Sequence, residues 1–168
     1  MRSSKTHSPF GYVVEALAAA GLLFHALLVL GAWDLLPAAI PIHYDLSGKV
    51  DAWGDKSDLL GLLGINFLVY AGLTFLGRYP HKLNYPWQIT AENAARQYEL
   101  ARNFLRVLKC EIVWLFAVIL MQTIGVSLGL ASGLGSFFLV SVIAVLALTV
   151  IGFMVIAAGS SFGNADQQ

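Results

Sequence analysis

Four apolar runs divide this chain, and they restrict its fold more than any other feature. They cover residues 10–33, 59–76, 110–130 and 136–158. A helix of about 20 apolar residues crosses the roughly 30 Å hydrocarbon core of a bilayer, and soluble domains do not repeat such runs. Only 12% of the residues are charged, against about 25% in soluble proteins. We therefore predict an all-α integral membrane protein, one membrane domain over residues 1–168 with four transmembrane helices in a bundle.

The first run is predicted to be a retained span and not a secretory signal peptide. Its 24 residues are interrupted by Glu15 and His25, and no cleavage pattern of small residues follows Trp33. The longer polar connections are a loop over residues 34–58 and a second stretch over 77–109. From Ala91 this second stretch is amphipathic, and no Pro or Gly interrupts residues 91–124. We expect one long helix, capped by Thr90, that extends into the third span.

Lysine and arginine are distributed unevenly over the connections. Of the ten, only Lys49 and Lys56 fall on the side of the 34–58 loop. The positive-inside rule then predicts that both termini and residues 77–109 are cytoplasmic, and that the 34–58 loop forms an extracytoplasmic cap. The formal net charge is zero, so no nucleic-acid partner is expected. The eight residues on the other side are Arg2, Lys5, Arg78, Lys82, Arg96, Arg102, Arg106 and Lys109.

Within the cap, Ile40, Ile42 and Tyr44 alternate with Pro41 and His43, which suits a short extended segment. Ser47-Gly48 is typical of a turn, after which residues 50–53 could return. A small hairpin and an irregular cap both fit this pattern.

Motifs in the cap and beyond it carry a resemblance to a known family. Residues 40–44 are Ile-Pro-Ile-His-Tyr, and residues 48–56 follow the pattern Gly-x-x-Asp-x-Trp-Gly-x-Lys. A later run, Asn-Tyr-Pro-Trp-Gln-Ile-Thr-Ala-Glu-Asn over residues 84–93, is followed by Gln97-Tyr98. Together these motifs resemble a bacterial domain of unknown function found in SdpI-type bacteriocin immunity proteins. The resemblance implies a multi-pass protein of the bacterial inner (plasma) membrane, and it implies no reaction.

The polar residues of the cap are candidates for binding. A calcium loop is not formed, because Lys49 occupies a ligand position, and a zinc site would need more ligands than His43. We therefore predict no metal and no cofactor. The simplest alternative is a solvated acidic loop in which Asp45 and its neighbours cap turns.

Two acids, Glu15 and Glu111, fall inside predicted spans, where ionisable groups are costly. They are expected to snorkel toward the membrane surface or to pair with Lys109 or Arg106, or else to handle protons or ions. No nucleophile elbow, metalloprotease or phosphate-binding motif is present, so no enzymatic activity is predicted.

Three further polar residues fall at similar depths in three different spans. Counted at 1.5 Å per residue, His25, Asn66 and Gln122 each lie roughly 18–23 Å above the inner boundary. Because a polar side chain facing lipid would be unsatisfied, we expect the three to turn inward and meet. With the cap they would form one outward-opening pocket. The predicted ligand-binding residues are thus His43, Asp45, Asp51, Trp53, His25, Asn66 and Gln122.

Two functional hypotheses of different class follow. The first is a binding protein whose outer loop recognises a peptide, lipid or protein partner, in an immunity-like or signalling role. The second is a small transporter-like or metal-handling protein that uses intramembrane Glu and His. Besides the lipid bilayer, a second copy of the chain is a possible partner, because the Gly125-x-x-x-Gly129 spacing lets helices approach closely.

Overall fold

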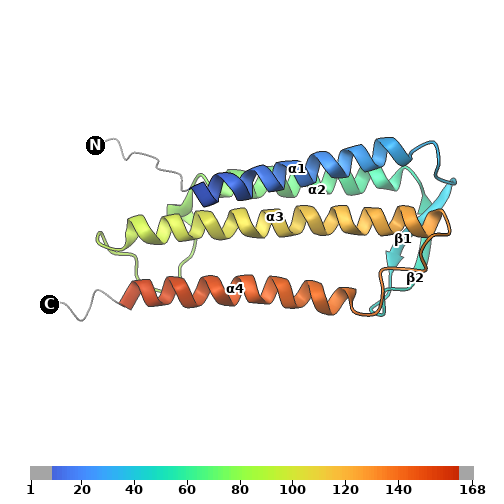
Figure 1. Cartoon of the computed structure of the whole chain (residues 1–168). Coiled ribbons are helices and arrows are strands. Elements are labelled where there is room, and N and C mark those ends of the chain that lie inside the picture. Colours follow the sequence, from blue (N-terminus) through green and yellow to red (C-terminus); the bar gives the residue numbers. More distant parts are fainter. Residues whose placement is uncertain (1–8, 163–168) are drawn as a thin grey trace.

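The computed structural model describes residues 9–162, and most of them are helical. Arg2 and Lys5, which entered the topology prediction, lie outside the described residues. The elements follow one another as α1, a hairpin of strands β1 and β2, α2, a short 3₁₀ turn η1, α3 and α4 (Figure 1). Their bounds are α1 Pro9–Ala32, β1 Ala39–Tyr44, β2 Val50–Asp55, α2 Asp58–Leu76, η1 Pro80–Lys82, α3 Ala94–Ser127 and α4 Phe138–Phe162.

Three of the four helices, α1, α2 and α4, are long and apolar enough to cross a membrane. At 1.5 Å per residue their 24, 19 and 25 residues extend over roughly 36, 28 and 37 Å. Their exposed surfaces are apolar, so a bilayer is the environment that satisfies them. The chain is therefore a membrane protein with apolar helices in contact with lipid.

Helix α3 is the centre of the arrangement, and α1, α2 and α4 all pack against it. In Figure 1, α1 and α2 lie together on one side of α3, and α4 runs along the other. The buried residues of α3 recur at spacings of three or four, which keeps them on one helical face. These residues are Gln97, Ala101, Leu105, Lys109, Val113, Ala117, Leu120 and Thr123.

The long helix begins three residues later than its sequence suggests. Thr90 and Asn93 cap each other: the Asn93 side chain accepts a hydrogen bond from the Thr90 amide, and the Thr90 hydroxyl accepts one from the Asn93 amide. This reciprocal capping holds residues 91–93 in a turn before α3 begins at Ala94. The predicted continuity into the apolar segment is correct, because α3 runs without a break to Ser127.

The cap is a β-hairpin, the more regular of the two predicted forms. Strands β1 and β2 pair antiparallel, with Pro41 opposite Trp53. Pro41 is tolerated because a two-stranded sheet has only edge strands, and the register shifts beside it. Gly48 supplies the turn with a φ of 78°, a conformation that suits glycine.

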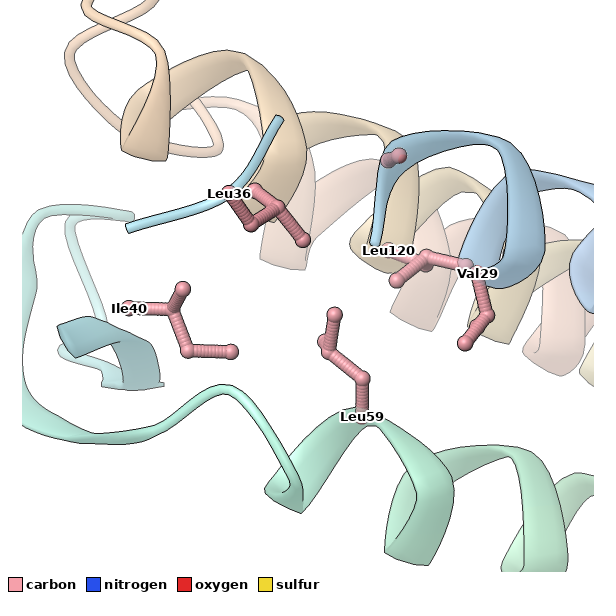
Figure 2. Packing of buried hydrophobic residues seen from close by; sticks show 6 residues of the cluster. Val29, Leu36, Ile40, Leu59 and Leu120 are labelled. Carbon is pink, nitrogen blue, oxygen red and sulfur yellow. The ribbon is translucent and has the colours of Figure 1, made fainter. Parts of the chain in front are cut away.

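The hairpin sits on the end of the helices by burying Ile40. Figure 2 shows Ile40 and Leu59 directed into the same space as Leu36, Leu120 and Val29. Ile40 itself is fully buried. Burying side chains of this size contributes about 1.5–3 kcal/mol each, so the cap is a packed part of the fold and not a mobile loop.

The glycines proposed for helix association have another role in the structure. Helix α3 ends at Ser127, and Gly129 adopts a φ of 73° beyond it. The Gly125 carbonyl then accepts a hydrogen bond from the Leu130 amide, which is the geometry of a glycine-terminated helix end. Gly125 and Gly129 therefore do not line one helical face, and the spacing does not carry an argument for a second copy of the chain.

Candidate functional site

The hairpin brings His43 and Asp51 together on its exposed surface. The His43 Nδ1 atom lies 2.6 Å from Asp51 Oδ1, although eight residues separate them in sequence. Asp51 and Trp53 are two residues apart in β2 and so lie on the same face of the strand. The Trp53 side chain is 57% exposed. Three of the four predicted cap residues thus form one surface, which combines a large aromatic ring with a titratable pair.

The fourth predicted cap residue, Asp45, organises the turn. Its Oδ1 atom accepts hydrogen bonds from the Ser47 hydroxyl and from the amides of Ser47 and Lys49, at 2.7–2.9 Å. These bonds, that of the Ser47 hydroxyl first, hold the pKa of Asp45 below its ordinary value. Asp55 accepts from the Ser57 amide in the same way, and that bond lowers its pKa as well. Asp45 and Asp55 are therefore turn-forming residues, as the alternative of a capped acidic loop predicted.

The inner side of the hairpin is fastened to three elements. The Tyr44 hydroxyl lies 2.9 Å from the Thr123 hydroxyl near the end of α3. At the tip, the Gly48 carbonyl accepts a hydrogen bond from the Leu134 amide in the link between α3 and α4. At the base, Lys56 Nζ donates to the Trp33 carbonyl. These contacts fix the hairpin at its tip, middle and base.

Below the hairpin, the structure brings together two of the three residues predicted to share a polar layer. The Asn66 amide nitrogen lies 2.8 Å from His25 Nδ1 and 3.4 Å from the Val113 carbonyl oxygen, and both side chains are fully buried. The His25 Nε2 and Asn66 Oδ1 atoms are buried without a hydrogen-bond partner among residues 9–162. Gln122 is not part of this pair, because the buried face of α3 passes through Thr123 instead.

The predicted pocket that would join this layer to the cap is not what the structure contains. The apolar cluster of Figure 2 lies between the His25–Asn66 pair and the hairpin, with Val29 one helical turn beyond His25. Six buried aliphatic residues fill this position, so His43 and Trp53 do not share a surface with His25. The prediction failed because depth estimates do not include the aliphatic residues on the intervening turns.

The intramembrane acid Glu15 belongs to a cluster near the opposite end of the helices. Lys109 Nζ donates to Glu15 Oε1 at 2.6 Å and to the Thr74 hydroxyl at 2.8 Å. The Tyr70 hydroxyl donates to the same Glu15 oxygen. Pairing with Lys109 was one of the expected arrangements. Tyr70 and Thr74 were missed, although their spacing from Asn66 is i+4 and i+8, which places all three on one face of α2.

The second acid, Glu111, pairs with neither of the expected bases. It accepts a hydrogen bond from the Thr149 hydroxyl of α4, and its Oε2 atom is buried without a partner among the described residues. Glu111 also lines a groove between α3 and α4.

Gln97 is a further residue that sequence reasoning did not single out as a site. Its side-chain nitrogen donates to the Ala157 carbonyl and lies 2.8–2.9 Å from the hydroxyls of Ser160 and Ser161, at the end of α4. Its oxygen accepts from the Trp87 indole. Gln97 therefore fastens α4 and the 77–93 connection to α3. Across residues 9–162, no three His, Cys, Asp or Glu side chains are grouped as metal ligands.

Comparison with known proteins gives one result for a segment of the chain. Residues 20–68 match the family model of a domain of unknown function (DUF1648). The segment runs from the middle of α1 through the hairpin to the middle of α2, and so contains both the His43–Asp51 surface and the His25–Asn66 pair. No curated protein and no solved structure matched the chain significantly.

Proposed function

We propose that this is a binding protein of the bacterial inner membrane, whose hairpin recognises a peptide or protein partner at the outer face. One observation carries the proposal: the hairpin is held rigidly on its inner side while its outer side exposes Trp53 and the His43–Asp51 pair. A rigid platform loses little conformational entropy on binding, which favours recognition over a structural role.

The composition of this surface supports a proteinaceous partner. Trp53 is more than half exposed. Aromatic anchors flanked by polar groups are the residues that dominate protein–protein interfaces. The His43–Asp51 pair adds a donor and an acceptor beside the ring, which would give the contact direction and specificity.

The proposed topology has four spans, with the hairpin at the outer face. The second half of α3, residues 110–127, contains Glu111 as its only charged residue and lies beside the three apolar helices, which supports its being the fourth span. Four spans put both termini on one side and the hairpin on the other. The basic residues 78, 82, 96, 102 and 106 belong to the end remote from the hairpin, as expected for a cytoplasmic end.

A transport role for Glu15 receives less support, because Lys109 supplies its counter-charge within the fold. Ion carriage needs a group whose partner can change, whereas Glu15 accepts hydrogen bonds from both Lys109 and Tyr70, and Lys109 is itself buried and also bonded to Thr74.

Site-specific photocrosslinking in intact cells tests the proposal. A benzophenone amino acid at Ile42 or Leu46 of the hairpin should give a discrete protein adduct, and the adduct should weaken at least fivefold in Trp53→Ala or Asp51→Ala. A matched probe at Leu68, an exposed residue of α2, should give lipid adducts alone. If the hairpin probes give the same lipid adducts as Leu68, the hairpin rests on the bilayer and the proposal is wrong.

A further inference from the structure

We infer that the partner of the hairpin presents an extended basic segment, which adds as a strand to the open edge of β2, the side of residues 50–55 that faces away from β1. The inference deepens the proposed function, because it rests on the hairpin being the recognition surface. The sheet has two strands, and β1 packs against α3 whereas β2 has no comparable helix contact among residues 9–162. A strand at the edge of a sheet leaves one row of backbone N–H and C=O groups unpaired, and an extended peptide can pair with that row.

The chain itself begins such a pairing at one end of the open edge. Lys49, which immediately precedes β2, forms an antiparallel bridge with Gly133 of the α3–α4 link. The Lys49 carbonyl accepts from the Asp45 amide on the side of β1, whereas the neighbouring Gly48 carbonyl accepts from the Leu134 amide of the link. Within residues 9–162 the link pairs with this edge no further, and the sheet ends at two strands. The edge therefore accepts an antiparallel partner, and the rest of β2 is left for one.

Two residues of β2 direct their backbone groups to the open edge. The Lys56 amide donates to the Ala38 carbonyl on the side of β1. Because backbone groups alternate in direction along an antiparallel strand, those of Trp53 and Asp55 point away from β1. Pro41 lies opposite Trp53 and has no N–H to donate, which agrees with a pair that exchanges no hydrogen bonds. An added strand would therefore bond the N–H and C=O groups of Trp53 and Asp55.

The side chains along this edge select a basic partner. Asp51 and Asp55 flank Trp53 at two-residue spacings, and all three side chains are exposed. Residues directly opposite one another in an antiparallel pair share a face of the sheet. A strand with Arg, an apolar residue and Arg at alternate positions would set its guanidinium groups against the carboxylates and its apolar side chain against the indole. A second copy of β2 would instead bring like charges together, which disfavours pairing between two hairpins.

Binding of a synthetic strand to the full chain, in nanodiscs of neutral phosphatidylcholine, tests the inference. The probe is the blocked heptapeptide Thr-Arg-Thr-Val-Thr-Arg-Thr, and the same peptide with Glu in place of Arg is the charge control. The Arg peptide should bind about tenfold more tightly than the Glu peptide. Asp55→Asn should lose most of this preference, since its amide oxygen still accepts from the Ser57 amide but carries no charge. Asp34→Asn, at an exposed position before the hairpin, should retain it.

N-methylation of the Arg peptide distinguishes strand addition from binding by side chains alone. In an antiparallel pair centred on Trp53, the amides of the Arg and Val residues face β2, and the amides of the Thr residues face away. Methylation of the three Arg and Val amides should therefore weaken binding by about tenfold or more. Methylation of the last three Thr amides adds the same number of methyl groups and should leave the affinity within about twofold.

Two outcomes would overturn the inference. If the two methylated peptides bind equally, the partner does not pair as a strand. If the Arg and Glu peptides bind equally, or neither binds, the partner is not a basic strand. In either case a discrete protein adduct at the hairpin in cells would leave the proposed function standing, because photocrosslinking requires neither strand pairing nor a basic partner. Circular dichroism establishes that each variant is folded, and the methylated peptides test the wild type without any substitution.

Discussion

Lys109 of α3 donates a 2.6 Å hydrogen bond to Glu15 of α1, across 94 positions of sequence. The Lys109 side chain is 2% exposed, whereas that of Glu15 is 36% exposed. The Thr74 hydroxyl accepts a second bond from Nζ, and the Tyr70 ring lies 4.5 Å beneath it. The Lys109 ammonium group therefore joins three helices at one point. It is much more deeply buried than the Glu15 carboxylate.

This difference in burial predicts that the two single substitutions lower the free energy of unfolding by different amounts. Glu15→Gln leaves a buried ammonium without a counter-charge, so we expect a loss of about 3–5 kcal/mol in the free energy of unfolding. Lys109→Met should cost less, because Glu15 is partly exposed and lies within two turns of the start of α1, from which its side chain can extend toward the membrane surface. Thermal unfolding in detergent would measure both, with Glu99→Gln as the control. Equal losses for the two variants would contradict the asymmetry.

The double variant Glu15→Gln/Lys109→Met should recover part of the loss, because no buried charge then remains. A double-mutant cycle would give the coupling between the two side chains. A coupling near zero would mean that the ion pair does not hold α1 against α3.

The junction between the hairpin tip and the α3–α4 link predicts a second effect. Gly48 has a φ of 78°, and a Cβ atom there would lie 2.6 Å from the Gly135 carbonyl oxygen. Gly48→Ala should therefore cost at least about 1–2 kcal/mol in the free energy of unfolding and expose the hairpin to proteolysis. Gly72→Ala in α2, where no atom lies within 4 Å of the new Cβ, should instead raise the free energy of unfolding by about 0.5–1 kcal/mol and leave protease resistance unchanged. Equal protease resistance in the two variants would show that the tip is not fastened.

The turn at Asp45 predicts a pH dependence. Hydrogen bonds from the Ser47 hydroxyl and from the Lys49 and Ser47 amides place the pKa of Asp45 below its ordinary value of 3.8. The lowered pKa belongs to the folded hairpin. The stability that the Asp45 carboxylate contributes is therefore complete above pH 3.8 and is lost as the pH falls through the lowered pKa. Amide NMR shifts of Ser47 and Lys49 should follow this titration below pH 3.8 and should be flat in Asp45→Asn. A midpoint above 3.8 would contradict the prediction.

The proposed four-span topology predicts the labelling of single cysteines in intact cells. In a background with Cys110 replaced by Ser, a cysteine at Lys49 should react with an impermeant maleimide, and one at Lys82 should react only after the membrane is opened. Lys49 lies in the hairpin turn and Lys82 in η1, at opposite ends of the helices (Figure 1). The reverse pattern would place the hairpin in the cytoplasm and refute the outer-face proposal.

The helices and the hairpin could be predicted because their signals are local. Hydropathy placed the limits of α1 and α2 within one residue of those observed. The turn at Ser47-Gly48 with flanking alternation indicated a hairpin as one of two possible forms of the cap, and the structure has this form. The start of α3 was misplaced at Ala91 because Thr90 and Asn93 are both good capping residues and only their mutual geometry decides between them.

The candidate sites were harder to predict because they depend on the rotation of each helix as well as on depth. Gln122 and Thr123 differ in depth by 1.5 Å but in direction by about 100°, and only Thr123 lies on the buried face of α3. The series Gln97, Ala101, Leu105, Lys109 and Val113 on that face could have excluded Gln122. The α3–α4 groove could not have been found in this way, since nothing in the periodicity of α4 shows how loosely it packs.

The His25–Asn66 pair gives the last prediction. Asn66 bonds His25 Nδ1 and the Val113 carbonyl, yet each of the two side chains keeps one buried polar atom without a partner among the described residues. Asn66→Leu removes those bonds and leaves the His25 ring without its partner, so it should cost about 1–3 kcal/mol in the free energy of unfolding. His25→Leu/Asn66→Leu removes every polar atom of the pair and should be near neutral or stabilising relative to the wild type. A double-mutant cycle tests this. The free energy of unfolding is measured in detergent for the wild type, both single variants and the double variant. A double variant less stable than either single variant would show that the pair stabilises the helices through its hydrogen bonds, and the prediction would then be wrong.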